Sequence, residues 1–187
     1  MNSPMFPVPS PRASRCLLAL LTLGTALFAA QAEDKLHPQL EKFRPLLGKT
    51  WRGEFKNSTP EKPVVDISRW ERALNGQAVR TLHSINRGDY GGETLIFWSE
   101  EKKSLVYHYF TTANFQTTGT MSFDGTKFTS LEKVTGQAGG VTEVKAVGEL
   151  RSDGTLLIKS EYLKKAQWTP GRETVYREDP KGEVVFR

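Results

Sequence analysis

The sequence predicts an all-β protein, an antiparallel up-and-down meander of about ten strands closed into a barrel and preceded by a short N-terminal helix. Apolar and polar residues alternate with period two through most of residues 49–178. Turn residues recur at short intervals along the same region and divide it into strand-length segments. These segments leave no room for the crossover helices that parallel strands require. Closure into a barrel would remove the exposed edges that such a meander otherwise keeps.

The predicted helix comes first. Leu36, Leu40, Phe43 and Leu47 recur at steps of four, three and four, which is the spacing of one helix face. Gly48 follows as a natural helix end, directly before the first strand.

Strong turn signals separate the strands that follow. Asn75-Gly76 is the clearest two-residue hairpin signal, and Asp124-Gly125 and Asp153-Gly154 repeat it. The predicted strands cover residues 49–56, 64–74, 77–86, 93–99, 104–112, 115–123, 126–135, 141–151, 155–163 and 172–178.

The N-terminal residues 1–32 have the pattern of a signal peptide. Arg12 and Arg15 precede or open an apolar run, and Ala30-Gln31-Ala32 is a small-x-small cleavage site. The run is too short to span a membrane comfortably. We therefore expect a periplasmic or secreted protein whose mature part, residues 33–187, is a single domain without a membrane span. The one cysteine, Cys16, would leave with the signal peptide, so no disulfide is expected.

Composition and motifs exclude several function classes. The net charge is +5, but Lys and Arg are scattered among acidic residues, so no nucleic-acid partner is expected. The sequence has no HExxH, GxSxG, P-loop or Cys/His cluster, so it predicts no catalytic residue, cofactor or metal site. An enzyme is not favoured. Glu132 could form an acid–base pair with His83 or His108 if the fold brought them together.

Two strands predict an open lumen. Alternation places Thr142, Val144, Ala146, Gly148 and Leu150 on one face of residues 141–151, and it places Leu156, Ile158, Ser160 and Tyr162 on one face of residues 155–163. Inner residues of this small size leave space for one small ligand in a barrel of eight to ten strands, as is roughly typical of such barrels. The alternative is that the helix or large neighbouring side chains fill the space.

Charged residues inside strands suggest how a ligand would be held. Arg80 lies between Ala78 and Leu82 on one face, and a charge in such a place needs a partner or a ligand. An inward arginine beside tyrosines could bind the head group of an amphipathic anion. The candidate ligand-binding residues are Arg69, Arg80, Trp98, Tyr107, His108, Tyr109 and Glu132. The alternative is a cross-strand pairing of Arg69 and Arg80 with Glu71.

The hairpin over residues 93–112 is apolar on both faces. Its two faces therefore both need cover, one from the lumen and the other from a helix or a second subunit. This pattern predicts a possible homodimer formed through the hairpin.

Three short motifs carry a resemblance to a known family. They are Leu46-Leu47-Gly48-x-x-Trp51-x-Gly53, Ala73-Leu74-Asn75-Gly76-x-Ala78-Val79 and the Gly-Gly-Glu-Thr-Leu-Ile-x-Trp run at 91–98. With them the chain resembles the lipocalin-like, calycin-type secreted bacterial proteins over most of residues 36–187. The resemblance implies that Trp51 closes one barrel end beneath an arginine, supplied by Arg172 or Arg177. Unlike the haem-binding barrels of similar size, the chain has no histidine after His108, so haem is disfavoured.

The predicted function is that of an exported barrel that binds a small amphipathic or apolar, lipid-like molecule. Two alternatives remain open: a cell-envelope interaction protein with a filled barrel, and a small lumenal enzyme. A lumen of several hundred cubic ångströms, roughly the size of known ligand sites, would favour the binder or the enzyme.

Overall fold

The structure, a computed structural model, describes residues 35–136 and 138–187. The chain divides into two units, Met1–Lys35 and Leu36–Arg187, and the fold is that of the second unit. The predicted signal peptide, residues 1–32, lies outside the described residues. No helix in the described ranges is both long and apolar enough to cross a membrane.

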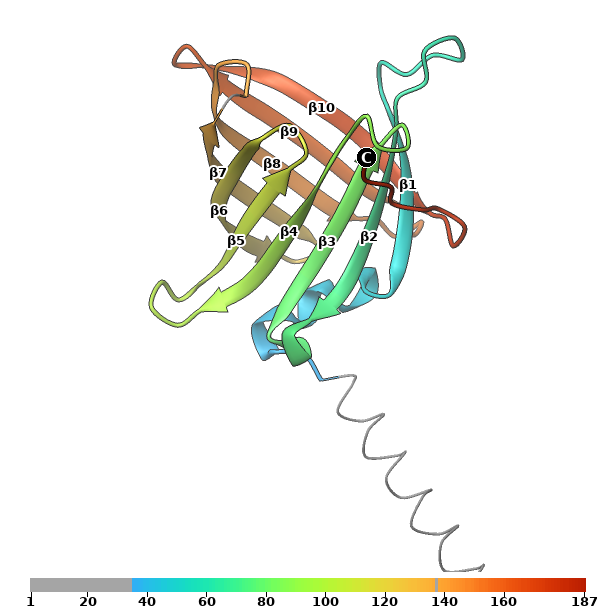
Figure 1. Ribbon diagram of the computed structural model, residues 1–187. Coiled ribbons are helices and arrows are strands. Elements are labelled where there is room, and N and C mark those ends of the chain that lie inside the picture. Colours follow the sequence, from blue (N-terminus) through green and yellow to red (C-terminus); the bar gives the residue numbers. More distant parts are fainter. Residues whose placement is uncertain (1–34, 137) are drawn as a thin grey trace, which may run out of the picture. The chain divides into compact units, whose positions relative to one another are not determined.

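Ten antiparallel strands form a closed barrel, which confirms the predicted fold class (Figure 1). Each strand pairs with its neighbours in the sequence, and β1 closes the barrel by pairing with β10. The strands are β1 (Lys49–Phe55), β2 (Val65–Ala73), β3 (Ala78–Ile85), β4 (Tyr90–Ser99), β5 (Ser104–Thr111), β6 (Phe115–Asp124), β7 (Lys127–Gly136), β8 (Val141–Leu150), β9 (Leu156–Lys164) and β10 (Gln167–Glu178).

A 3₁₀ helix, η1 (Pro38–Leu46), lies across one end of the barrel (Figure 1). Its first turn is capped by His37, whose side chain accepts a hydrogen bond from the backbone N–H of Gln39. Leu40, Phe43 and Leu46 are buried on the barrel side of η1. Leu40 and Phe43 thus lie on the predicted face, and Leu36 is buried just before η1. The prediction for Leu47 is wrong: a 3₁₀ helix has three residues per turn, so Leu46 follows Phe43 on this face and Leu47 is the C-cap.

Aromatic side chains fill the half of the barrel next to η1. Phe43 packs edge-on against Phe123 at 4.9 Å, and its ring also contacts Trp70 and Phe128. Trp51 is 1% exposed and its indole N–H donates to the carbonyl oxygen of Leu46 at 3.5 Å. This end of the lumen is closed by packing.

The cation next to Trp51 corrects one expectation. The Lys49 ammonium lies 5.7 Å from the Trp51 ring centre. Neither of the expected arginines takes this place: Arg172 lies over Phe55, and Arg177 is exposed on β10. Arg177 points outward because side chains alternate along β10. Arg172 lies six residues before Glu178, the residue that pairs with Trp51, and so it is far from Trp51 along the strand.

The β2–β3 turn also differs from the expected two-residue hairpin. Ala73 pairs with Ala78, so four residues form the connection. Leu74, Asn75 and Gly76 have φ angles of 49°, 52° and 84°, three consecutive left-handed conformations. Asn and Gly tolerate this region best, so the Asn-Gly signal marks the turn correctly but not its length.

The C-terminal tail covers part of the outer face of β1–β3. The backbone N–H of Val185 donates to the Ser84 hydroxyl at 3.0 Å, and a Cβ at Gly182 would lie 3.2 Å from Ile67. The tail therefore shields side chains that point away from the lumen. An apolar or buried residue on β2 or β3 is for this reason not necessarily an inward one.

Candidate functional site

The lumen is open at the end opposite η1, where it holds a cavity of about 460 Å³. Its apolar wall includes Phe55, Ile85, Phe115, Val134, Val144 and Ile158. Its polar groups are those of Tyr90, Tyr109, Thr117, Glu132, Ser160, Tyr162 and Arg172. A smaller cavity of about 150 Å³ shares Tyr109, Glu132 and Arg172 with it and reaches Asp66 and His83. A cavity of a few hundred cubic ångströms that combines an apolar wall with polar groups is typical of a small-molecule site.

The small residues of β8 and β9 make this space, as their alternation predicts. Val144, Ala146, Ile158, Ser160 and Tyr162 all line the cavity. The prediction for Thr142 is wrong, because a bulge between Val141 and Glu143 shifts the register and turns Val141 into the cavity instead.

Arg172 enters the lumen from a second bulge, between Pro170 and Glu173 on β10. The Ser160 hydroxyl of β9 accepts a hydrogen bond from the Arg172 backbone N–H at 3.0 Å and lies 3.3 Å from its carbonyl oxygen. A Cβ at Gly171 would lie 2.6 Å from this hydroxyl, so glycine is what allows Ser160 to approach. The bulge and Ser160 together fix the backbone from which Arg172 projects.

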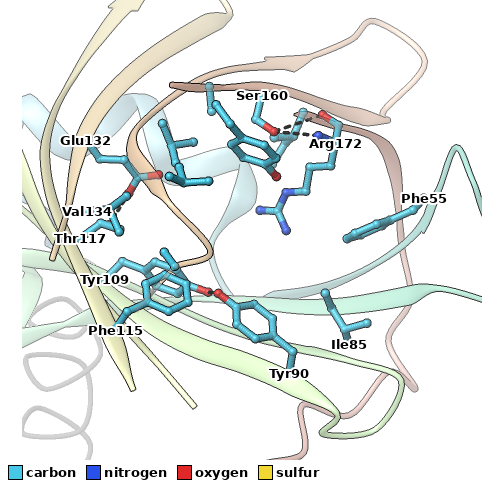
Figure 2. A pocket seen from close by; sticks show the side chains of 16 residues that line it. Phe55, Ile85, Tyr90, Tyr109, Phe115, Thr117, Glu132, Val134, Ser160 and Arg172 are labelled. Carbon is cyan, nitrogen blue, oxygen red and sulfur yellow. Dashed lines mark hydrogen bonds between the residues drawn. The ribbon is translucent and has the colours of Figure 1, made fainter. Parts of the chain in front are cut away.

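The guanidinium group of Arg172 projects into the cavity beside Phe55, as Figure 2 shows. Its Cζ lies 5.7 Å from the centre of the Phe55 ring, a cation–π contact. Within residues 35–136 and 138–187, no ion pair and no side-chain hydrogen bond engages this guanidinium. The charges of Asp66 and Glu132 act on Arg172 from elsewhere in the lumen, but neither carboxyl group forms an ion pair with it. Its N–H groups are therefore available to an anion in the cavity.

A chain of hydrogen bonds runs from β2 across β3 and β5 to the cavity wall. Asp66 Oδ1 lies 2.9 Å from His83 Nδ1, and His83 Nε2 lies 2.7 Å from the Tyr109 hydroxyl oxygen. That oxygen lies 2.7 Å from the hydroxyl oxygen of Tyr90 (Figure 2). At the buried end, the Tyr176 hydroxyl donates to Asp66 Oδ2 at 2.6 Å. We call the four residues Asp66, His83, Tyr109 and Tyr90 the tyrosine relay.

Glu132 forms a second polar pole of the cavity, on β7. Its carboxyl group accepts a hydrogen bond from the hydroxyl of Thr117, and hydrogen bonding from Thr117 and Tyr107 lowers its pKa. Burial raises the pKa of Glu132, and these hydrogen bonds and the charge of Arg172 offset only part of that rise. Among the described residues, the cavity thus combines a guanidinium group that makes no ion pair with a carboxyl group that burial favours in its neutral form.

Some of the sequence-predicted ligand residues do meet in the lumen. Tyr109 and Glu132 line the main cavity, and Tyr107 lines the smaller one. Trp98 lies at the closed end instead, where it stacks on His37 and donates its indole N–H to Glu100 at 2.9 Å. His108 is also not in the lumen: it lies on the outer face of β5.

Arg69 and Arg80 lie on the outer face, which corrects the expectation that they point inward. Both pair with Glu71, and Arg69 Nε lies 2.7 Å from its Oε1. This is the cross-strand pairing weighed as the alternative. Their neighbours Ile67 and Leu82 share the outer face, so the rule that the apolar face points inward fails on these two strands.

The residues that sequence reasoning missed are Asp66, Tyr90 and the lumenal role of Arg172. His83 was considered as a partner of Glu132, but the structure pairs it with Asp66. One signal was present: Asp66 and Ser68 on β2, and Thr81 and His83 on β3, form a run of polar residues on one face. A polar inner face is typical of a barrel whose lumen has a function. In the described part of the chain, no group of three His, Cys, Asp or Glu side chains could hold a metal ion.

The fold and cavity define the class, a closed ten-stranded antiparallel β-barrel with a lumenal cavity. No protein-family model and no curated protein matches the chain. Among solved structures it is similar to the crystal structure of Rv2717c from M. tuberculosis, with a TM-score of 0.58 and 14% sequence identity. The match covers 78% of this chain and 99% of that one. At this identity the likeness shows a shared fold and nothing about the ligand.

Proposed function

We propose that the protein binds a small amphipathic anion in its lumen, a carboxylate or similar oxyanion attached to an apolar body. The observation that carries this proposal is the free guanidinium of Arg172 inside a cavity of about 460 Å³. Around it, the walls supplied by residues such as Phe55, Phe115 and Ile158 suit an apolar body.

The size of the cavity also bears on the two alternatives. A barrel filled by its own side chains would be expected in a protein that acts only through its outer surface, whereas this lumen holds a cavity of about 460 Å³. A lumenal enzyme would use the same cavity. The proposal includes export, since residues 1–32 have the pattern of a signal peptide.

Titration with the fluorescent probe 1-anilinonaphthalene-8-sulfonate tests the proposal, because the probe is an anion with an aromatic body. Arg172→Met removes the charge and keeps an unbranched apolar side chain. We expect it to weaken binding by roughly tenfold or more, the effect of losing a charge-assisted hydrogen bond. Arg80→Met is the matched control, since Arg80 lies on the outer face. It should bind the probe as the unmodified protein does.

A second ligand separates charge recognition from apolar contact. N-phenyl-1-naphthylamine has the same rings without the sulfonate, so Arg172→Met should leave its affinity nearly unchanged. Circular dichroism and a melting curve establish that each variant is folded. The proposal is wrong if the unmodified protein shows no saturable binding of the sulfonate, or if Arg172→Met binds it as tightly.

A further inference from the structure

The tyrosine relay has a property that follows from counting its protons. Each hydroxyl group has one proton, and each contact in the relay is short enough to require a donor. Among the described residues, the Tyr109 hydroxyl has no hydrogen-bond partner other than His83 and Tyr90, so the direction of one of these two hydrogen bonds fixes the direction of the other. Of the four relay residues, Tyr90 and Tyr109 line the main cavity, whereas Asp66 and His83 line the smaller one. A ligand in the main cavity therefore meets the relay at Tyr90 and Tyr109.

Neutral His83 sets one direction. A carboxylate only accepts hydrogen bonds, so the proton of the neutral ring lies on Nδ1, facing Asp66. Nε2 then accepts from the Tyr109 hydroxyl, and the Tyr109 oxygen accepts from Tyr90. Tyr90 therefore donates its only hydroxyl proton to Tyr109. Toward the cavity its oxygen presents lone pairs, which repel the oxygen atoms of an anion.

Protonated His83 sets the opposite direction. Both ring nitrogens then donate, so the Tyr109 oxygen accepts from Nε2 and its proton turns to Tyr90. Tyr90 accepts from Tyr109, and its own proton is free to point into the cavity. The same hydroxyl becomes a donor on the side of the lumen where Arg172 projects (Figure 2).

We propose that His83 is a proton-controlled positioning residue, which makes Tyr90 a second donor for an oxyanion when His83 is protonated and an acceptor when it is neutral. This inference rests on the proposed function, and it assigns the ligand a head group with at least two acceptor oxygens, one for Arg172 and one for Tyr90. When His83 is neutral, the Tyr90 hydroxyl instead favours a ligand that donates a hydrogen bond, such as an alcohol or an amide.

Among the four relay residues, His83 is the one whose change of protonation reverses the hydrogen bonds. The titratable or charged side chains that face it, or share its cavity, come from five strands: Asp66 (β2), Tyr90 (β4), Tyr107 and Tyr109 (β5), Glu132 (β7), and Arg172 and Tyr176 (β10). Burial raises the pKa of Tyr90 and of Tyr109, so both stay neutral while histidine titrates.

The test is the pH dependence of probe affinity between pH 5 and pH 9 at constant ionic strength. The sulfonate of 1-anilinonaphthalene-8-sulfonate stays ionised over this range, so a slope does not come from the probe. We expect the unmodified protein to bind roughly tenfold more tightly at the acidic end, the effect of exchanging an acceptor for a donor beside an anion. Tyr90→Phe, which keeps the ring and removes the hydroxyl, should lose this slope, and His83→Gln should lose it as well.

Glu132 could contribute a slope of its own, because its ionisation would also repel an anion. The series is therefore repeated in a Glu132→Gln background, where any slope that remains belongs to the relay. Tyr90→Phe keeps the test decisive if His83→Gln does not fold. The inference is overturned if Tyr90→Phe retains the slope, or if the unmodified protein binds through Arg172 with equal affinity at every pH. The latter result leaves the proposed function intact, whereas absence of binding at every pH overturns both.

Discussion

The carboxyl group of Glu132 accepts a hydrogen bond from the hydroxyl of Thr117 across the β6–β7 pair inside the lumen. The two residues are diagonal neighbours, since Thr117 pairs with Val134 and Glu132 with Gly119. Thr117 is buried, and the contact holds Glu132 against the wall of the cavity. An acidic side chain in this position couples the stability of the barrel to pH.

Glu132→Gln should make the protein more stable than the unmodified chain, by an amount that grows with pH. Burial raises the pKa of Glu132 in the folded state above its ordinary value of 4.5. The folded state thus holds the proton to higher pH than the unfolded state, so stability from this group is present below pH 4.5 and is lost as pH rises through the folded pKa. The gap in unfolding free energy between the two proteins should therefore widen steadily as the pH rises from 4 to 8.

Urea midpoints of both proteins at intervals from pH 4 to pH 8 measure this gap. Glu101→Gln is the control, because Glu101 is exposed and should show a constant difference from the unmodified protein. A gap for Glu132→Gln that stays constant, or that shrinks as the pH rises, would show that the folded protein does not hold this proton.

Trp51→Ala should destabilise the barrel by about 3–5 kcal/mol, the usual result of removing a large buried ring. Trp51 is 1% exposed and lies between η1 and the aromatic side chains that fill the closed half. Trp168→Ala is the matched control, since Trp168 is 41% exposed, and it should cost less than about 1 kcal/mol. The difference is measured by urea denaturation, and equal midpoints for the two variants would contradict the closed-end packing.

The strand order could be predicted because it depends on local signals. Turn residues such as Asn75-Gly76, Asp124-Gly125 and Asp153-Gly154 mark the connections between several strands. A meander joins neighbours in sequence, so no long-range information is needed to order them. The sequence also predicted that part of the lumen is open. Ala146 and Ser160 leave space because they are small, and no other part of the chain has to be known to see this.

The direction of the charged side chains could not be predicted, because it depends on distant segments. The C-terminal tail covers the outer face of β2 and β3, so Ile67 can point outward, and Asp66 and His83 face the lumen instead. Arg172 points inward because a bulge on β10 meets the Ser160 hydroxyl of β9. Neither contact leaves a periodic pattern in the sequence.

The signal-peptide prediction is tested by expressing the full chain in a Gram-negative host and measuring the mass of the protein in the periplasmic fraction. Cleavage after Ala32 should leave Glu33 as the first residue. Ala32→Tyr places a large residue at the cleavage site and should block processing. Gln31→Tyr changes the tolerant middle position by a similar volume and should be processed normally. Full-length protein in the periplasm would contradict the prediction.

The outer face of the 93–112 hairpin carries a ladder of stacked rings. Phe97 and His108 are 6.3 Å apart at an interplanar angle of 4°, and His108 and Phe110 are 6.4 Å apart at 12°. Phe110 is 53% exposed at the end of this ladder. The possible homodimer remains a prediction, and an exposed aromatic surface of this kind is where a second subunit would pack.

Phe110→Ser should weaken self-association by more than roughly tenfold, as is usual when an aromatic contact is lost from an interface. Sedimentation velocity over a range of protein concentrations measures the effect. Leu74→Asn is the control: Leu74 is 65% exposed in the β2–β3 turn, outside the hairpin, and its φ of 49° suits asparagine. It removes a comparable apolar surface and should leave association unchanged. If the unmodified protein sediments as a monomer at every concentration, or if Phe110→Ser associates equally well, the hairpin is not a dimer interface.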